Sequence, residues 1–423
     1  MRLHIYISIL FVFVISNSFG QKEITLQYCH SRAIEVSPLQ KQKLLYTSLN
    51  ELSDQSSREI NLPMLMLNGQ ATYQSDVFRM PFEVPGIDSP LIPKNQYKVG
   101  IDFYQNIYNG GKAKNQQSIN GSQDRINQQS IEISLYKVHE VINKLYFSVL
   151  LLQEQIQLLI STQEDLAAQK NLVDSKIKSG AALPGSSKSL LKEILSLDQL
   201  VIELDIRKNS NKDLLGAWME EDITSSSLTL PVTAENTSDL NRPEISMFDY
   251  QIEAIQTKVG MIDSDRIPDV GVFGTAGIGY PNPLNWFSVK HDPYALVGIK
   301  FSWKILDYGK AKNDRESAKL NQQIVLAEKE NFVKKLTISV SGLNAEAGKY
   351  KLLIEKDAEI ISLQEEIIAE SSAQLQNGII PSANFIIEVN KGLQAKLNMK
   401  IHEIMLSESY INILTETGNI GEL

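Results

Sequence analysis

The chain has 423 residues, a net charge of −9 and a single cysteine, Cys29. It carries 41 Lys and Arg against 50 Asp and Glu without a basic cluster, so we predict no nucleic-acid partner, because phosphate contacts need Lys and Arg. One cysteine excludes an intrachain disulfide and a cysteine-rich metal site. The histidines lack the spacing of metal ligands and no Ser/His/Asp arrangement stands out. We therefore predict no catalytic residue, no cofactor, no metal site and no enzyme activity.

Residues 1–20 have the pattern of a secretory signal peptide. Arg2 supplies the positive start, residues 5–15 the apolar stretch, and residues 18–20 the small residues of a cleavage site. The alternative is a membrane anchor helix, which needs about 20 apolar residues, more than this run contains. No later run is apolar enough for a membrane helix. We predict cleavage before Gln21 and an exported mature protein.

The first repeat of the chain is predicted over residues 21–219. It opens with a helix pattern over about 25–61 and continues into a β-hairpin over about 63–108. A long helical hairpin follows over about 110–219. It turns at a tip over residues 180–184, where a glycine and a proline follow the first helix as they commonly do. The polar stretch over residues 220–240 is predicted to be a linker.

The second half of the chain repeats the first. Residues 99–115 and 297–313 match at ten of seventeen positions without a gap, at an offset of 198 residues. An internal repeat of this length indicates one structural unit built twice. The second repeat, over residues 241–423, has a helix, a β-hairpin over about 269–307, and a helical hairpin over about 309–414 with its tip at 378–382.

Both β-hairpins alternate apolar and polar residues, which places the two sets on opposite faces of each strand. We predict that the apolar set faces lipid, as in outer-membrane barrels. This set comprises Val99, Ile101, Phe103, Val297, Ile299, Phe301 and Trp303. The alternative is a soluble sheet with one wet face. Four strands cannot close a barrel and lipid tolerates no open sheet edge, so lipid-facing strands require several chains to share one barrel.

The helices after the hairpins have the spacing of a coiled coil. No proline occurs between Gly111 and Pro184 or between Gly309 and Pro381, so each helix could reach on the order of 100 Å. Apolar residues recur every three or four positions over five heptads, which indicates packing against neighbouring helices. Polar residues interrupt this stripe. They are Gln163, Lys170, Asp357, Gln364 and Ser371. Such residues either set the register of the coiled coil or line a channel.

This layout resembles the TolC-like outer-membrane efflux protein family over nearly the whole mature chain. The most specific segments are the two repeated segments and residues 376–400, QNGIIPSANFIIEVNKGLQAKLNMK. The resemblance implies an α+β membrane protein with two structural repeats. Three chains would share one twelve-stranded transmembrane β-barrel, four strands from each, and a long α-helical coiled-coil barrel. The implied location is the outer membrane, with a large periplasmic helical domain.

The resemblance also implies partners and contact residues. A periplasmic adaptor would meet the helical tips, at Gly180, Ala181, Pro184, Gly378, Ile379 and Pro381. An inner-membrane ABC or RND-type transporter would supply the energy. Many members carry acidic residues six and nine positions after the second tip glycine, where they form a periplasmic constriction. Those positions hold Asn384 and Ile387 here and the nearest carboxylate is Glu388, which puts an acidic ring in doubt.

We therefore predict the exit duct of a tripartite efflux or type I secretion system. It would be a passive conduit for drugs, metals, peptides or proteins, opened by its partners. The alternatives are a periplasmic adaptor and a soluble coiled-coil scaffold. Lysines surround the first tip and glutamates the second, so the tips either attract one another or are two solvated faces. The residues concerned are Lys176, Lys178, Lys188, Lys192, Glu365, Glu366, Glu370 and Glu388.

Overall fold

The computed structural model describes residues 23–78, 91–180, 182–231, 239–285 and 288–422. The predicted signal peptide, residues 1–20, lies outside them. The chain divides into two compact units. The first comprises Met1–Ser37, Leu135–Asn241 and Leu336–Leu423, and the second comprises Pro38–Ser134 and Arg242–Lys335. Each unit therefore combines residues from both sequence repeats. None of the helices in the described ranges combines the length and apolar character of a membrane span.

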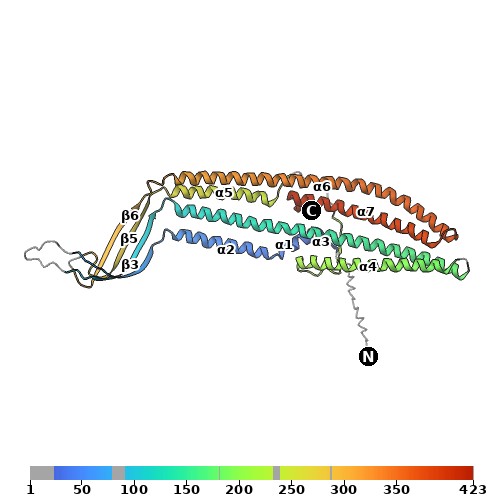
Figure 1. Cartoon of the computed structure of the whole chain (residues 1–423), viewed down its shortest axis with the longest axis horizontal. Coiled ribbons are helices and arrows are strands. Elements are labelled where there is room, and N and C mark those ends of the chain that lie inside the picture. Colours follow the sequence, from blue (N-terminus) through green and yellow to red (C-terminus); the bar gives the residue numbers. More distant parts are fainter. Residues whose placement is uncertain (1–22, 79–90, 181, 232–238, 286–287, 423) are drawn as a thin grey trace, which may run out of the picture. The chain divides into compact units, whose positions relative to one another are not determined.

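The helices follow the repeat closely (Figure 1). Two helices have 67 residues each, α3 and α6, and two have 36 each, α4 and α7. The single opening helix expected from the sequence is divided into two helices. Pro38 disfavours the helical conformation in the residue before it, and a new helix starts at this proline. The bounds are α1 Leu26–Glu35, α2 Pro38–Glu59, α3 Lys112–Lys178, α4 Pro184–Met219, α5 Pro243–Ser264, α6 Lys310–Gln376, α7 Ser382–Thr417, and the short 3-10 helix η1 Ile420–Glu422.

The second unit contains a four-stranded antiparallel sheet in the order β2-β3-β5-β6. Pairing of β3 with β5 joins the hairpin of the first repeat to that of the second. The outer strands, β2 and β6, have no further partner among the described residues. The first unit holds a short parallel pair, β1 with β4. The bounds are β1 Glu23–Ile24, β2 Met64–Tyr73, β3 Asn95–Tyr108, β4 Ser227–Leu228, β5 Asp269–Tyr280 and β6 Asp292–Ser302.

Trp303, which we predicted on a lipid-facing strand, lies one residue beyond the end of β6. Strand β6 ends at Ser302, which pairs with Asp269, the first residue of β5. Trp303 therefore has no partner on β5 to continue the ladder. Its indole N–H instead donates to the Arg266 carbonyl oxygen at 3.0 Å.

The first unit is held by an apolar core between its helices. Tyr146 is fully buried there, with its hydroxyl 2.9 Å from the Ile24 carbonyl and 2.6 Å from the Thr229 carbonyl. The hydroxyl thereby satisfies backbone groups beside the β1–β4 pair. Cys29 is buried in the same core, and burial followed by the charge of Glu221 raises the pKa of its thiol to about 12. The thiol is thus a small packing group.

The helices of the second unit are joined mainly by polar contacts. Ion pairs connect α2 to α3, α3 to α5, and α5 to α6, with N–O distances of 2.5 to 2.6 Å. They are Lys43–Glu132, Arg125–Glu253 and Lys329–Asp249. The leucines of α2 lie exposed, between 54 and 71%. They are Leu44, Leu45, Leu49 and Leu52. An exposed apolar stripe on a helix that packs through its polar side indicates a surface for another chain.

Candidate functional site

The sheet has two chemically different faces, set by its register. Rows across the four strands pair Phe103 with Gly274 and Gly274 with Val297, so these residues share one face. We call it the apolar face. Five of the predicted lipid-facing residues that belong to it are exposed, from 52 to 77%. They are Val99, Ile101, Val297, Ile299 and Phe301, and the sixth, Phe103, is half-buried. A contiguous exposed apolar surface of this kind marks contact with a membrane or another protein.

Aromatic residues flank the apolar face. At the loop end, the Tyr97 and Tyr280 rings stack with centroids 5.3 Å apart. At the helix end, Phe301 and Trp303 are 63 and 51% exposed. Aromatic rings at both ends of an apolar band are typical of barrels that cross a membrane, where they lie at the two interfaces.

The opposite face, which we call the polar face, carries side chains such as Gln70, Lys98 and Asp102. Asp102 accepts hydrogen bonds from the Thr275 hydroxyl at 2.6 Å and from the Asn68 amide. Aromatic rings on this face lie over glycines of the neighbouring strand. A Cβ atom at Gly271 would lie 2.8 Å from the Tyr104 hydroxyl. The glycines therefore let the rings lie flat against the sheet.

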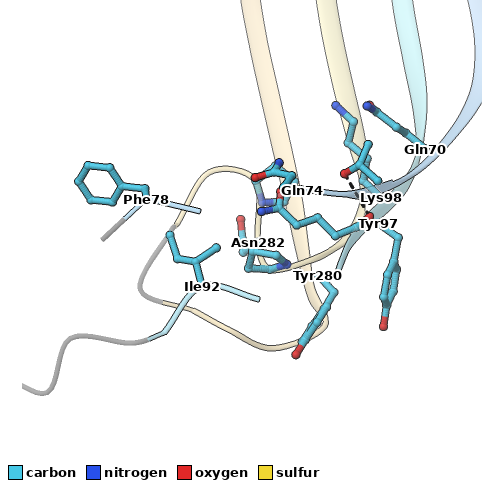
Figure 2. Close-up of a pocket in the computed structure, with 12 residues that line it drawn as sticks. Gln70, Gln74, Phe78, Ile92, Tyr97, Lys98, Tyr280 and Asn282 are labelled. Carbon is cyan, nitrogen blue, oxygen red and sulfur yellow. Dashed lines mark hydrogen bonds between the residues drawn. The ribbon is translucent and has the colours of Figure 1, made fainter. Parts of the chain in front are cut away.

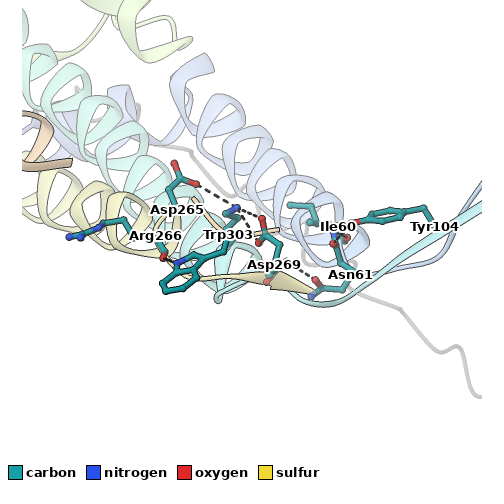
Figure 3. Close-up of polar contacts among 10 residues, drawn as sticks. Ile60, Asn61, Tyr104, Asp265, Arg266, Asp269 and Trp303 are labelled. Carbon is teal, nitrogen blue, oxygen red and sulfur yellow. Dashed lines mark hydrogen bonds and ion pairs between the residues drawn. The ribbon is translucent and has the colours of Figure 1, made fainter. Parts of the chain in front are cut away.

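The junction between strands and helices explains the repeated Gly-Lys-Ala-Lys-Asn motif. Gly111 and Gly309 adopt φ angles of +82° and +84°, which favour glycine, immediately before α3 and α6. Asp265 and Asp269 lie at this junction (Figure 3). In the first copy, Lys112 Nζ lies 3.1 Å from Asp269 Oδ2 and 3.6 Å from Asp265 Oδ1. The Asn115 amide donates to the Gly260 carbonyl at 2.9 Å. The motif thus turns the chain into a helix and ties that helix to β5 and α5.

The tip of each helical hairpin turns at a left-handed glycine. Gly180 and Gly378 have φ angles of +77° and +71°. The N–H of Ile379 donates to the Gln374 carbonyl at 2.9 Å, which closes the last turn of α6. Pro184 begins α4 and Pro381 caps α7, so each proline starts the returning helix. Ala181, the remaining predicted tip residue, lies outside the described residues.

The structure brings the two tips together within one chain. The Lys176 ammonium contacts the Gln376 carbonyl at the end of α6, where a cation also complements the helix dipole. The Gln169 amide donates to the Ser372 hydroxyl at 2.7 Å. A groove of about 560 Å³ lies between the tips, and both contribute to its lining. Its lining includes Leu172, Lys176, Leu183, Gly378, Ile379 and Pro381.

The predicted constriction residues differ in their exposure. Asn384 and Ile387 are exposed on α7, whereas Glu388 is half-buried and turned toward α6. Glu388 accepts hydrogen bonds from Lys391 at 2.9 Å and from Gln364 at 3.0 Å, and these contacts lower the pKa of its carboxyl. Its carboxylate is therefore engaged inside the second hairpin.

Two of the four glutamates around the second tip are paired within their own hairpin. Glu365 lies 2.8 Å from Lys396 and Glu388 lies 2.9 Å from Lys391. Lys188 forms no ion pair with any residue that the structure describes. Within one chain, the contacts of Lys176 and Gln169 join the tips instead. Attraction between oppositely charged tips remains a hypothesis for neighbouring chains, with Lys188→Glu as its test variant in closed-state conductance.

The two hairpins differ at equivalent positions of their helix interfaces. In the first hairpin, Leu159 and Leu204 are buried in the core between the helices. The residues 198 positions later are Asp357 and His402, and His402 Nδ1 lies 2.6 Å from Asp357 Oδ2. Asp357 is only 7% exposed. Asp357 was predicted either to set the register of the coiled coil or to line a channel. Its buried contact supports the first role.

A second buried polar network joins α1, α3 and α7. His30 Nε2 lies 2.7 Å from Asn143 Oδ1, and the Asn143 amide donates to the Thr415 hydroxyl at 2.9 Å. The rings of His30 and His139 meet edge to face at 4.4 Å. Burial, and then the charge of His139, lowers the pKa of His30 to about 3, and burial lowers the pKa of His139 to about 4. Both rings are therefore neutral at ordinary pH.

We expect acid to destabilise the first unit through these histidines. In the unfolded chain both bind protons as the pH falls through 6.5, whereas the folded chain resists protonation until about 4 and about 3. Stability is therefore complete above pH 6.5 and declines below it, by at most about 1.4 kcal/mol per histidine per pH unit. Thermal unfolding between pH 7.5 and 5 measures the decline. His30→Asn with His139→Gln should flatten it, whereas His291→Gln, in the other unit, should not. An equally steep decline in the double variant would contradict this account.

Solved structures share this fold. The outer membrane protein VceC of Vibrio cholerae has a TM-score of 0.67 and 14% identity, over 92% of this chain and 96% of VceC. The Campylobacter jejuni CmeC outer membrane channel has a TM-score of 0.65 and 15% identity, over 93% of this chain and 86% of CmeC. The Neisseria gonorrhoeae MtrE outer membrane channel has a TM-score of 0.65 and 13% identity, over 93% of this chain and 89% of MtrE.

The chain has the TolC-like fold. This confirms the fold predicted from the sequence, with its long helical hairpins and its β-strands. No protein-family model matches the chain, and no curated protein matches it. The TolC-like fold is thus established from three-dimensional similarity, which persists at 12–15% identity among the similar structures.

Proposed function

We propose that the protein is a passive exit duct in the outer membrane, part of a tripartite efflux or type I secretion system. The observation that carries the proposal is the apolar face of the sheet, with Val297 and Ile299 three-quarters exposed. A soluble adaptor or coiled-coil scaffold would bury such a face. A bilayer covers it, with the flanking aromatic rings at the two interfaces.

The open edges of the sheet support a shared barrel. Strands β2 and β6 have backbone groups without a partner strand in the described part of the chain, and such groups cost several kcal/mol each in lipid. Three copies in a homotrimer would pair these edges and close twelve strands, with the polar face around a wet lumen. The exposed leucine stripe of α2, from Leu44 to Leu52, would then pack against a neighbouring copy.

The tips supply the surface for a periplasmic adaptor. Gly378, Ile379 and Pro381 border the groove between the tips, and Ile379 is 70% exposed. An apolar side chain presented on a rigid turn suits a protein contact. An inner-membrane ABC or RND-type transporter would provide energy, because the duct itself only holds the passage open or closed. The similar channels named above have the same fold, which is compatible with this role.

Two measurements on full-length protein test the proposal. Membrane fractionation should place it in the outer membrane as a heat-modifiable oligomer, and the purified oligomer should form ion-conducting pores in planar lipid bilayers. Recovery as a soluble monomer or dimer would contradict the proposal and favour an adaptor or scaffold. An outer-membrane oligomer without conductance would contradict the duct while keeping the membrane location.

A further inference from the structure

Lys98 occupies a singular place on the polar face, near the loop end of the sheet (Figure 2). It lines an outer cavity of about 390 Å³, drawn in Figure 2, and a larger, deeper cavity of about 590 Å³ beside it. Its side chain and that of Gln70 lie on the side of the sheet opposite to the Tyr97 and Tyr280 rings. A charge at this point would face the lumen of a closed barrel.

The loop after β5 turns inward over the same face. A Cβ atom at Gly279 would lie 2.6 Å from Pro283 Cδ, so the proline packs directly on the polar face at this glycine. Asn282 Oδ1 accepts from the N–H groups of Leu284 at 2.9 Å and Asn285 at 3.2 Å, which holds the turn. Pro283 and Leu284 line the larger cavity together with Lys98. The loop thus narrows the space in front of the ammonium.

Lys98 is the sole charged residue among those that line the outer cavity in the described part of the chain. The other polar lining groups are neutral, including the amides of Gln70, Gln96 and Asn282. The nearest carboxylate on the same face and strand, Asp102, lines only the deeper cavity and is engaged by Thr275 and Asn68. Lys98 itself forms no hydrogen bond or ion pair with any described residue.

We propose that Lys98 is the charge-selecting residue of the outer mouth and favours anionic solutes, such as those bearing carboxylates or phosphates. The inference rests on the proposed duct, in which three copies would place three Lys98 ammoniums around one lumen beneath three inward loops. Rings of Lys or Arg select anions in pores, and a cavity with low-dielectric walls focuses their field. The amides around Lys98 can donate hydrogen bonds to the same anion.

Reversal potentials across planar bilayers in a potassium chloride gradient test the proposal. Lys98→Gln should lower the ratio of chloride to potassium permeability relative to the unaltered protein, and Lys98→Glu should lower it further. Lys98→Arg should preserve it. The matched control is Lys290→Gln. Lys290 is an exposed lysine in the loop between β5 and β6, and it lines neither cavity. Equal heat-modifiable oligomer for every variant shows that folding is unchanged.

The outcomes separate this inference from the proposed function. Unaltered protein that forms pores, with a permeability ratio that Lys98→Glu leaves unchanged, overturns the role of Lys98 alone. An equal change in Lys290→Gln also overturns it, because the effect would then come from surface charge in general. Failure of the unaltered protein to conduct overturns both the duct and the role of Lys98. The inference is supported if the ratio of chloride to potassium permeability falls in Lys98→Gln, falls further in Lys98→Glu, and does not change in the Lys290→Gln control.

Discussion

Arginine in place of Ile299 is expected to abolish assembly of the sheet in the outer membrane. Ile299 is 75% exposed on the apolar face, in the same row as Val272 of β5. A charged side chain on the lipid side of a barrel strand costs about 2–4 kcal/mol at the bilayer midplane and less toward the interfaces. Three copies would each carry this cost in a shared barrel. The amount of heat-modifiable oligomer in outer-membrane fractions should therefore fall steeply.

The neighbouring residue provides the matched control. Lys300 points to the polar face, opposite Gly271, so Lys300→Arg introduces the same side chain one residue away without contact with lipid. This variant should assemble as well as the unaltered protein. Normal assembly of Ile299→Arg would mean that the apolar face does not contact lipid. Loss of assembly in both variants would indicate a local folding defect and would leave the exposed apolar face unexplained by a membrane.

Alanine in place of His402 is expected to loosen the second helical hairpin. It removes the hydrogen-bond partner of Asp357, whose side chain is only 10% exposed, and leaves a buried carboxylate unsatisfied. A buried group left without its hydrogen bond costs about 1–3 kcal/mol, and more when the group is charged. Hydrogen exchange should therefore accelerate in α6 and α7 around these residues. The equivalent segments of α3 and α4 serve as an internal reference.

The first hairpin suggests the compensating change. Asp357→Leu with His402→Leu reproduces the Leu159 and Leu204 of the first repeat, and apolar replacement of a buried pair is often neutral or stabilising. The double variant should regain the protection that His402→Ala loses. Full protection in His402→Ala would contradict a structural role for the pair. Failure of the double variant to recover would show that the second hairpin cannot accept the packing of the first.

The sequence was sufficient for most of the architecture because its signals are long and repeated. The offset of 198 residues fixes equal lengths for α3 and α6 and for α4 and α7. Alternation over ten or more residues assigns strand faces, since a slip of one residue would exchange every side chain. Glycines at Gly180 and Gly378 mark turns whose positive φ angles few other residues adopt.

Other features depend on contacts that no local pattern carries. Trp303 continues the alternation of β6, but the register places Pro268 opposite it, and a proline has no N–H to extend the ladder. Aligning the two repeats could have revealed the Asp357–His402 pair, because Asp357 then aligns with Leu159 and His402 with Leu204. Lys98 has no hydrogen-bond or ion-pair partner among the described residues because Asp102 bonds to Thr275 and Asn68, and a loop covers its cavity; both are tertiary contacts. The ion pairs between the helices of the second unit likewise follow no periodic pattern in the sequence that would predict them.

Electron microscopy of the protein purified in detergent from outer membranes tests the central claim most directly. The account predicts particles with threefold symmetry, in which one barrel of twelve strands is built from four strands of each chain. Strand β2 of one copy should pair with β6 of the next, with Ile299 toward the detergent belt and Lys98 toward the lumen. A soluble particle, a barrel closed by one chain, or a sheet with Ile299 turned inward would contradict the account.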